Sequence, residues 1–208
     1  MTNTTTHTAC VFIVDDDEQV RNALTLLMES IGLQAASFAS AQEYLDQFDA
    51  ERPGCLILDV RMPGISGLDL QARLSAEMIH PPIIIITGHG DVPMAVRAVT
   101  AGAIDFIEKP FNNQSMLDNV NRAIGLDAKQ RGESLRLYEI DNRYNELTPR
   151  EKEVLQCVID GKRNKIIAAD MNISQSTVEA HRAKVMDKMQ ANSLSDLMRM
   201  ALLLKLIT

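Results

Sequence analysis

The chain has 208 residues, of which 46% are hydrophobic and 24% charged, with a net charge of -7, and this length predicts two modest domains rather than one. No apolar run reaches the ~18 residues that a membrane-spanning helix needs, and residues 1–8 lack the basic and apolar pattern of a cleaved signal, so a cytoplasmic protein is predicted. The widely separated Cys10, Cys55 and Cys157 predict reduced core thiols rather than disulfides or metal ligands.

The first 125 residues alternate short apolar runs with amphipathic segments. The apolar runs predict strands at residues 10–14, 33–38, 55–58, 83–86 and 104–107, and the other segments predict helices at residues 18–31, 41–48, 68–78, 93–101 and 115–124. Residues 83–86 are all isoleucine, which indicates a central strand that is buried on both sides. Because parallel strands need helical crossovers, the pattern predicts an α/β domain with a five-stranded parallel sheet covered on both faces.

A charged segment separates this region from a second one. Residues 126–146 contain one small apolar patch and predict a partly helical linker, and only helical periodicity follows, so residues 147–208 predict an all-α domain. The charge is divided in the same way. Residues 1–125 hold 7 basic and 16 acidic side chains, a charge of -9, whereas residues 147–208 hold 10 and 7, a charge of +3. This division fits an acidic regulatory domain joined to a nucleic-acid reader, although chance asymmetry would also produce it.

Charged and polar residues stand at the ends of the predicted strands. Asp15 and Asp16 end the first strand, Asp59 ends the third, Thr87 ends the fourth, and Lys109 follows the fifth. Ligands of open parallel sheets bind at the carboxyl ends of the strands, so these side chains are expected to share one site. Three carboxylates at one edge repel one another unless a cation or protons compensate, and a hard divalent cation such as Mg²⁺ (or Mn²⁺), which prefers oxygen ligands, is the predicted answer.

Asp59 is the predicted phosphoryl acceptor. The turn at residues 61–64 carries the chain away from the strand end and leaves the carboxylate accessible. Beside a divalent cation, and with the ammonium of Lys109 and the hydroxyl of Thr87 opposite, this carboxylate can accept a phosphoryl group as an acyl phosphate. Lys109–Pro110 is a candidate for a cis peptide bond, which would fix the direction of Lys109. A strand-terminal Asp pair is often only a solvated helix cap, so the joint spacing carries the prediction.

Together these residues resemble the receiver domain of two-component response regulators. Residues 87–96 and 101–111 are similar to the FixJ branch of that family, and the resemblance covers essentially the whole chain. It implies a flavodoxin-like (CheY-like) receiver fold over residues 1–125. The implied roles are Asp59 as phosphoacceptor, Asp16, Asp59 and the Arg61 carbonyl as metal ligands, Asp15 as a metal ligand through water, Thr87 and Lys109 as phosphoryl-binding residues, and Phe106 as an aromatic switch.

The C-terminal region carries strong helix-start signals. Thr148 and Glu151 predict the capping box of a first helix. Asn164 is predicted to cap a second helix, and Ser174 a longer third one that runs to about Met189. A helix, a short turn and a longer helix are typical of a helix-turn-helix unit.

The longer helix is predicted to present a polar face to a DNA major groove, although a solvated face is the alternative. Residues 148–151, 164–165, 176–178 and His181 resemble the LuxR-type DNA-binding domain, which would span residues 147–208 as the second domain. The resemblance implies phosphate contacts by Lys165, Arg182, Lys184 and Lys188, base-facing positions at Glu179, Ala180 and Ala183, and further DNA-binding positions at Gln175, Ser176 and Thr177.

Two of these positions depart from the wider family, several members of which carry Lys where Glu179 and Ala183 stand. Glu179 can accept a hydrogen bond from cytosine N4, and Ala183 can contact a thymine methyl group. A different operator is therefore predicted, and exchanging Glu179 for Lys should alter the sequence preference.

The resemblances predict a transcriptional regulator that catalyses only its own phosphorylation and dephosphorylation. Its partners would be a cognate sensor histidine kinase, promoter DNA, RNA polymerase and, after phosphorylation, a second copy of the chain. Phosphorylation is expected to draw in Thr87 and Lys109, turn Phe106 inward and favour a dimer. Release of a covered DNA-binding surface is an equally plausible route.

Two other classes of protein could use the same residues. A haloacid-dehalogenase-like phosphatase would need a second aspartate two residues after Asp59, where Arg61 stands. A signalling adaptor would bind protein through its helical domain. The dependence of binding on salt separates an adaptor from a DNA-binding protein, because phosphate contacts release counterions.

Overall fold

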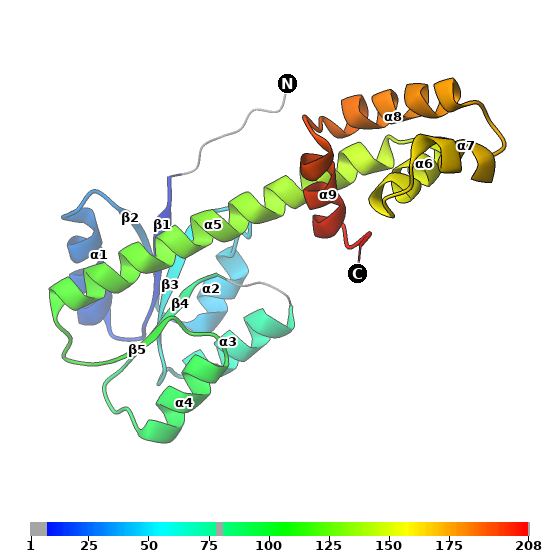
Figure 1. Cartoon of the computed structure of the whole chain (residues 1–208). Coiled ribbons are helices and arrows are strands. Elements are labelled where there is room, and N and C mark those ends of the chain that lie inside the picture. Colours follow the sequence, from blue (N-terminus) through cyan, green and yellow to red (C-terminus); the bar gives the residue numbers. More distant parts are fainter. Residues whose placement is uncertain (1–7, 78–80, 208) are drawn as a thin grey trace. The chain divides into compact units, whose positions relative to one another are not determined.

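A computed structural model describes residues 8–77 and 81–207 of the chain (Figure 1). The chain divides into two compact units, Met1–Gln130 and Arg131–Thr208. Within the described residues, no helix has the length and apolar character needed to cross a membrane.

The first unit is built on one parallel sheet with the strand order β2-β1-β3-β4-β5. Its strands are β1 (Cys10–Val14), β2 (Gln34–Phe38), β3 (Gly54–Asp59), β4 (Ile83–Thr87) and β5 (Asp105–Glu108). Its helices are α1 (Glu18–Glu29), α2 (Ala41–Gln47), α3 (Gly67–Ala76), α4 (Val92–Thr100) and the first part of α5 (Asn113–Asn145). The predicted five-stranded α/β fold is confirmed, and only the expected end of the third helix at Met78 lies outside the described residues.

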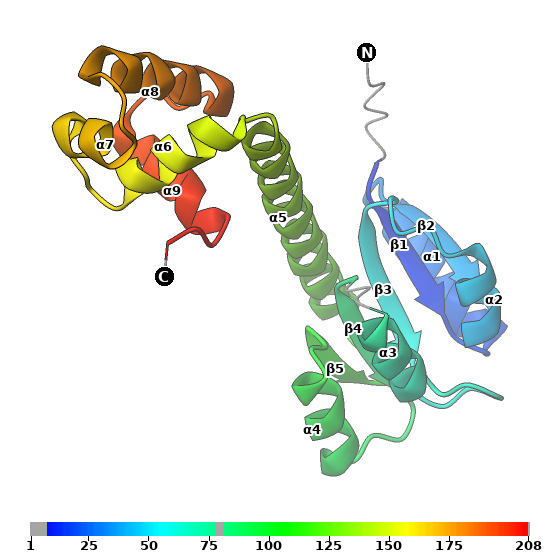
Figure 2. The ribbon, with the colours of Figure 1, turned by 90° about the vertical axis from the view of Figure 1, so that its right-hand side faces the viewer.

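Helices lie on both faces of the sheet (Figure 2). Alternate residues of the central strands belong to two different cores, one on each side of the sheet. Phe12 and Leu56 pack in the core that includes buried residues of α2, α3 and α4. Val11 and Ile57 pack in the core that includes buried residues of α1 and α5. This two-sided burial explains why the central strands are apolar up to the polar residues at the ends of β3 and β4.

Helix α5 is longer than the sequence pattern predicted. Residues 126–145 are helical throughout, so the expectation of a partly helical linker was wrong in extent. The segment contains no proline, and side chains one turn apart interact, as where Asn145 Nδ2 donates to Asp141 Oδ2 at 3.0 Å. Such contacts and good helix formers sustain a helix without a wide apolar face. Asp127 is buried, and its carboxylate accepts a hydrogen bond from the Gly54 amide at 2.9 Å.

The second unit is all-α, as predicted. After the end of α5 it contains α6 (Pro149–Ile159), α7 (Asn164–Asp170), α8 (Gln175–Met189) and α9 (Leu194–Leu203), which enclose one apolar core. Both hydrogen bonds of the Thr148–Glu151 capping box are present, and Ser174 caps α8. Asn164 does not cap α7. Arg163 occupies that position without a side-chain hydrogen bond, and the Asn164 side chain contacts α8 instead.

The cysteines form no disulfide in the structure. Cys10 and Cys55 are buried and Cys157 is half-buried, and all three are free thiols. Burial raises the pKa of Cys55 to about 12, which keeps this thiol protonated. Cys10 and Cys55 thus lie in the core as expected, whereas Cys157 is only partly covered.

Candidate functional site

Three residues from different strand ends meet in one hydrogen-bonded cluster. Asp15 follows β1, Asp59 ends β3 and Lys109 follows β5. The ammonium nitrogen of Lys109 lies 2.6 Å from Asp15 Oδ2 and 2.8 Å from Asp59 Oδ1. Both carboxylates are buried, with Asp15 0% and Asp59 4% exposed. The parallel register brings the carboxyl ends of these strands to one edge of the sheet, as the sequence predicted.

The backbone around this cluster fixes the two carboxylates. The second oxygen of Asp59 accepts a hydrogen bond from the Arg61 amide at 2.7 Å, and Asp15 accepts one from the Asp17 amide at 2.9 Å. Gly67, the first residue of α3, packs against the end of β3, because a Cβ atom there would lie 2.1 Å from the Asp59 carbonyl oxygen. The turn between β3 and α3 therefore both orients Asp59 and requires a glycine after it. The Lys109–Pro110 peptide bond is cis.

The electrostatics of the cluster are unbalanced. Burial raises the pKa of Asp59, although the hydrogen bond from Lys109 opposes this effect. Burial also acts to lower the pKa of Lys109, but the hydrogen bonds to Asp15 and Asp59 outweigh it and raise the pKa. Two carboxylates thus share one ammonium group, and the buried cluster keeps a net negative charge. A further cation near the carboxylates would be stabilised by this charge.

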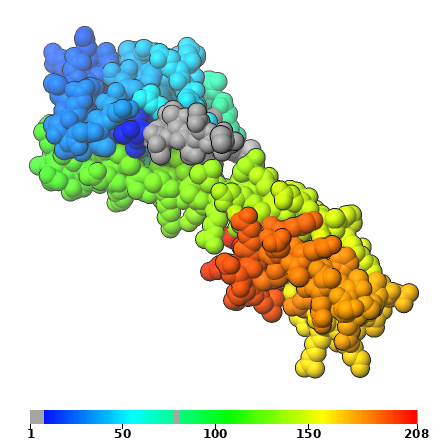
Figure 3. Space-filling view, turned by 90° about the horizontal axis from the view of Figure 1, so that it is seen from above, coloured from blue at the N-terminus to red at the C-terminus, as the bar shows by residue number. Residues whose placement is uncertain are grey.

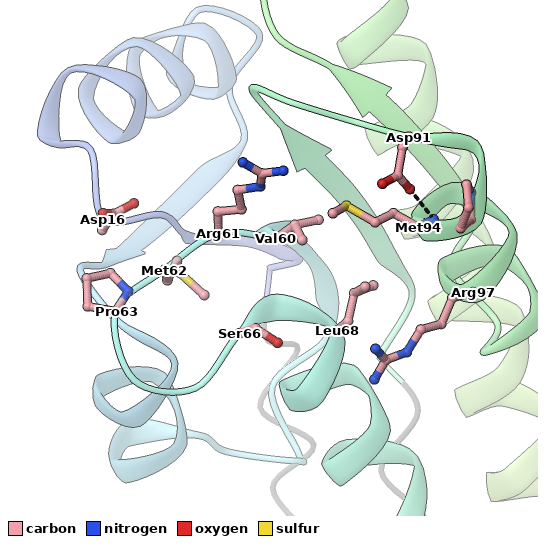
Figure 4. A pocket seen from close by; sticks show the side chains of 11 residues that line it. Asp16, Val60, Arg61, Met62, Pro63, Ser66, Leu68, Asp91, Met94 and Arg97 are labelled. Atoms are coloured by element: carbon pink, nitrogen blue, oxygen red, sulfur yellow. Dashed lines mark hydrogen bonds between the residues drawn. The ribbon is translucent and has the colours of Figure 1, made fainter.

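An open pocket of about 760 Å³ is lined by residues that directly follow Asp15 and Asp59 in the chain. Figure 4 shows the side chains that line it. Asp16 lines the pocket with Arg61 from the β3–α3 turn, and Met94 and Arg97 line it from α4. Within residues 8–77 and 81–207, no three His, Cys, Asp or Glu side chains are grouped as a metal cage. Mg²⁺ does not need such a cage, because it retains several waters and binds one or two carboxylates. The oxygen donors of Asp16, Asp59 and the Arg61 backbone fit a hydrated hard cation of this kind.

Thr87, a predicted phosphoryl-binding residue, and Phe106, the predicted aromatic switch, lie on either side of Gly90. Thr87 is fully buried at the end of β4, and its hydroxyl accepts a hydrogen bond from the His89 amide at 3.3 Å. Phe106 is half-buried on β5. A Cβ atom at Gly90 would lie 2.9 Å from Phe106 Cε1 and 3.2 Å from Thr87 Cγ2. Thr87, Gly90 and Phe106 therefore form one tightly packed group that the sequence reasoning had not recognised.

Helix α4 is loosely embedded in the first unit. Ala98 is its only buried residue among those described, whereas Val92, Val96 and Val99 are 76%, 59% and 56% exposed. The buried amide of Gln71 on α3 donates a hydrogen bond to the Ala98 carbonyl at 3.0 Å. Three exposed valines on one short helix form an apolar patch of the kind used for protein contacts.

The helix-turn-helix of the second unit is formed by α7 and α8. Atoms of α8 lie at the surface in Figure 3, where they are orange. Most of the predicted DNA-facing residues are exposed, namely Lys165, Gln175, Ser176, Thr177, Glu179, Ala180, Ala183 and Lys184, and Arg182 is half-buried. The predicted inward residues Val178, Val185 and Met189 are buried. The structure thus presents one polar face of α8 to solvent.

Lys188 differs from the other candidate residues. Its ammonium nitrogen lies 2.7 Å from Glu151 Oε2 and 3.2 Å from the Glu146 carbonyl oxygen. Glu151 is 3% exposed, and the hydrogen bonds from Lys188 and Thr148 lower its pKa to about 2. Lys188 therefore holds α8 against the start of α6, and a contact with phosphate would require this ion pair to open.

Comparison with known proteins agrees with this architecture. Residues 11–121 match the response regulator receiver domain, and residues 145–201 match the luxR family of bacterial regulatory proteins. Nodulation protein W of Bradyrhizobium diazoefficiens is 46% identical, and the match covers 93% of this chain and 85% of that protein. The transcriptional regulatory protein FixJ of Azorhizobium caulinodans is also 46% identical, over 93% of this chain and 92% of its own length.

The similarity extends to solved structures. The structure of the response regulator StyR matches with a TM-score of 0.86 at 41% identity, covering 93% of this chain and 98% of that one. A receiver fold with an acidic edge, followed by a helix-turn-helix unit, defines a two-domain regulator of the two-component type. The chain belongs to the response regulators that combine a receiver domain with a LuxR-type DNA-binding domain, and it functions in transcription regulation. The predicted fold class and family resemblance are confirmed.

Proposed function

We propose that this regulator is switched by transfer of a phosphoryl group from a sensor histidine kinase to Asp59. The observation that carries the proposal is the position of Lys109, whose ammonium group lies within 2.8 Å of Asp59 and 2.6 Å of Asp15. The cluster combines a nucleophilic carboxylate with a cation that can follow the phosphoryl oxygens. A receiver of this kind catalyses only its own phosphorylation and dephosphorylation.

In the proposed reaction, an Asp59 oxygen attacks the phosphorus atom of the kinase's phosphohistidine. The new O–P bond replaces the P–N bond, and the histidine imidazole is the leaving group. Lys109 gives up its contact with Asp59 and binds a phosphoryl oxygen, and the Thr87 hydroxyl donates to another. Asp16, Asp59 and the Arg61 carbonyl would hold Mg²⁺ (or Mn²⁺), with Asp15 ligating it through water. When bound, the metal ion offsets the negative charge that develops on the phosphoryl oxygens.

The proposed output begins at the packed group of Thr87, Gly90 and Phe106. Movement of Thr87 toward the phosphoryl group leaves space into which the half-buried Phe106 ring turns. The exposed valines of α4 then supply an apolar surface for a dimer with a second copy. Two DNA-binding domains in one dimer gain affinity without any new base contact.

The proposed domain boundaries are residues 1–125 for the receiver, 126–146 for the connecting segment and 147–208 for the DNA-binding domain. In the latter, Lys165, Lys184 and Arg182 are proposed to contact DNA phosphates and the exposed residues of α8 to face the bases. Promoter binding would place the protein in the cytoplasm and bring it to RNA polymerase.

The test is phosphorylation of the full chain by acetyl phosphate in the presence of Mg²⁺. Intact-mass spectrometry should show the addition of one phosphoryl group to the wild type and none to Asp59→Asn. Asp49→Asn, an exposed control, should react like the wild type. Size-exclusion chromatography should show a dimer only where the phosphoryl group is added. A dimer formed by Asp59→Asn with the donor, or phosphorylation of that variant, would contradict the proposal.

A further inference from the structure

The helix-turn-helix contains a polar bridge between α7 and α8. Asn164 is the first residue of α7. Its side-chain carbonyl accepts a hydrogen bond from Arg182 Nη1 at 2.9 Å, and its side-chain amide donates to Glu179 Oε1 at 3.5 Å. One neutral side chain of α7 thus contacts two oppositely charged residues on α8.

This arrangement separates two charges that could otherwise pair. Glu179 and Arg182 are three positions apart on one helix, a spacing at which opposite charges commonly form an ion pair. In the part of the chain that the structure describes, these two side chains form no ion pair with each other. Asn164 instead receives the hydrogen bond from the guanidinium group and gives one to the carboxylate. Glu179 is left exposed and Arg182 half-buried.

The separation matters because the two side chains suit different parts of DNA. A carboxylate near the phosphate backbone is repelled, but in the major groove it can accept a hydrogen bond from the N4 amino group of cytosine. A guanidinium group is suited to phosphate oxygens. A direct ion pair between Glu179 and Arg182 would occupy both groups and weaken both contacts.

We propose that Asn164 is a positioning residue for sequence readout, which holds Glu179 for a base contact and Arg182 for the DNA backbone. The inference rests on the proposed DNA-binding function and deepens it. Loss of the Asn164 side chain should reduce the preference for particular sequences more than it reduces the affinity for DNA in general.

The experiment uses the full chain at low salt, with and without acetyl phosphate. Specific duplexes of about two helical turns (~21 base pairs) are selected by the wild type from a randomised pool, and poly(dI·dC) is the non-specific duplex. Asn164→Ala should lower the ratio of specific to non-specific affinity about tenfold, the lower range for one base contact. Asn192→Ala, an exposed asparagine outside α7 and α8, should leave the ratio unchanged.

A second substitution keeps the test valid if Asn164→Ala disturbs the fold, as circular dichroism would reveal. Asn164→Asp retains an acceptor for Arg182 but repels Glu179, and acidic residues are tolerated in the first turn of a helix. It should lower the affinity ratio as Asn164→Ala does, and its added negative charge should also weaken binding to the non-specific duplex. An unchanged ratio in this variant would overturn the proposal.

A double-substitution cycle tests whether Asn164 acts through Glu179. The ratio measured for Glu179→Ala should change little when Asn164→Ala is added, because the positioned acceptor is already lost. Independent effects that multiply would overturn the inference and leave the DNA-binding function intact. A wild type that binds neither kind of duplex would overturn the proposed function as well, so the two failures are distinguishable.

Discussion

Each unit of this regulator pairs a half-buried lysine with a buried carboxylate at a similar distance, but the pKa of the carboxylate shifts in opposite directions in the two units. Lys109 lies 2.8 Å from Asp59 and Lys188 lies 2.7 Å from Glu151. The pKa of Asp59 is raised by burial, whereas the pKa of Glu151 is lowered to about 2, first by the hydrogen bond from Lys188. The distance between the lysine and the carboxylate therefore does not by itself show which way the pKa of the carboxylate is shifted.

The difference comes from the number of charges that share each lysine. In the receiver, one ammonium group serves both Asp15 and Asp59, so a buried negative charge remains. In the DNA-binding unit, Glu151 has Lys188 to itself and also accepts a hydrogen bond from the Thr148 amide at 2.9 Å. The first arrangement leaves one negative charge uncompensated, which suits the proposed attack of Asp59 on a phosphoryl group. In the second arrangement the two charges are matched, so the pair stabilises the fold.

The largest effect is expected for Lys109→Ala. This substitution leaves two buried carboxylates without their ammonium partner, and breaking a buried pair costs about 3–5 kcal/mol. Urea unfolding of the full chain in EDTA should show this loss for the receiver. Mg²⁺ should restore much of it, because the ion would compensate the same carboxylates. Lys165→Ala, at an exposed position, is the control, and an equal loss with and without Mg²⁺ would contradict the comparison.

Glu151→Ala should have a smaller but clear effect on the second unit. It removes the capping box and leaves Lys188 unpaired, but this lysine side chain is 32% exposed and can turn to water. A loss of roughly 2–3 kcal/mol is therefore expected, below the range for a fully buried pair. Thermal unfolding followed by circular dichroism measures it. Glu153→Ala is the matched control, because its pair with Arg150 is exposed.

The same pair predicts a dependence of stability on pH. The folded-state pKa of Glu151, about 2, lies below its ordinary value of 4.5. The pair therefore contributes its full stability above about pH 4.5 and loses it as the pH falls through about 2. The difference in melting temperature between the wild type and Glu151→Gln should shrink across this window. A difference that stays constant or grows toward low pH would show that the carboxylate charge is not responsible.

Asp59→Asn should stabilise the receiver by about 1 kcal/mol in the absence of divalent cations. The substitution removes one of two buried negative charges, so that Lys109 is matched by Asp15 alone. Urea unfolding in EDTA measures the gain, and Asp49→Asn is an exposed control. Destabilisation by Asp59→Asn would show that the acidic cluster is held together by its charges rather than opposed by them.

The smallest effect is expected for a buried polar group that has no partner. The Tyr44 hydroxyl is buried without a hydrogen bond among the described residues, while its ring packs against Phe12, Phe38 and Phe48. Tyr44→Phe should leave stability unchanged or raise it by up to ~1 kcal/mol, because no hydrogen bond is lost. Tyr138→Phe, at an exposed ring, gives the reference value. A clear destabilisation would indicate that the hydroxyl has a bound water.

Much of the receiver could be predicted from the sequence because its strands are apolar on both faces and end in polar residues. The carboxyl ends of parallel strands meet at one edge, so the meeting of Asp15, Asp59 and Lys109 followed from topology. The sharing of one ammonium group between two carboxylates did not follow, because it depends on side-chain directions. The exposed valines of α4 were also missed, since an apolar face predicts burial as readily as a contact surface.

The second unit shows the same limit. The capping box at Thr148 and Glu151 was readable because its spacing is local. The engagement of Lys188 with Glu151 spans 37 positions, and a lysine on a polar helix face gives no sign of it. Asn164 has the side chain of a good helix cap, but tertiary contacts with Glu179 and Arg182 recruit it into the first turn of α7. Residue preferences at helix ends predict the capping residue only where the side chain does not form hydrogen bonds with a neighbouring helix.

Gly90 bears on the activity of the regulator before phosphorylation. Because Gly90 has no side chain, the Phe106 ring can pack against its backbone. A Cβ atom at this position would lie 2.9 Å from Phe106 Cε1. A methyl group at this position would crowd the ring and favour its displaced orientation even without a donor. If Phe106 switches as proposed, Gly90→Ala is expected to raise transcription in the absence of a phosphoryl donor, which a reporter assay would measure.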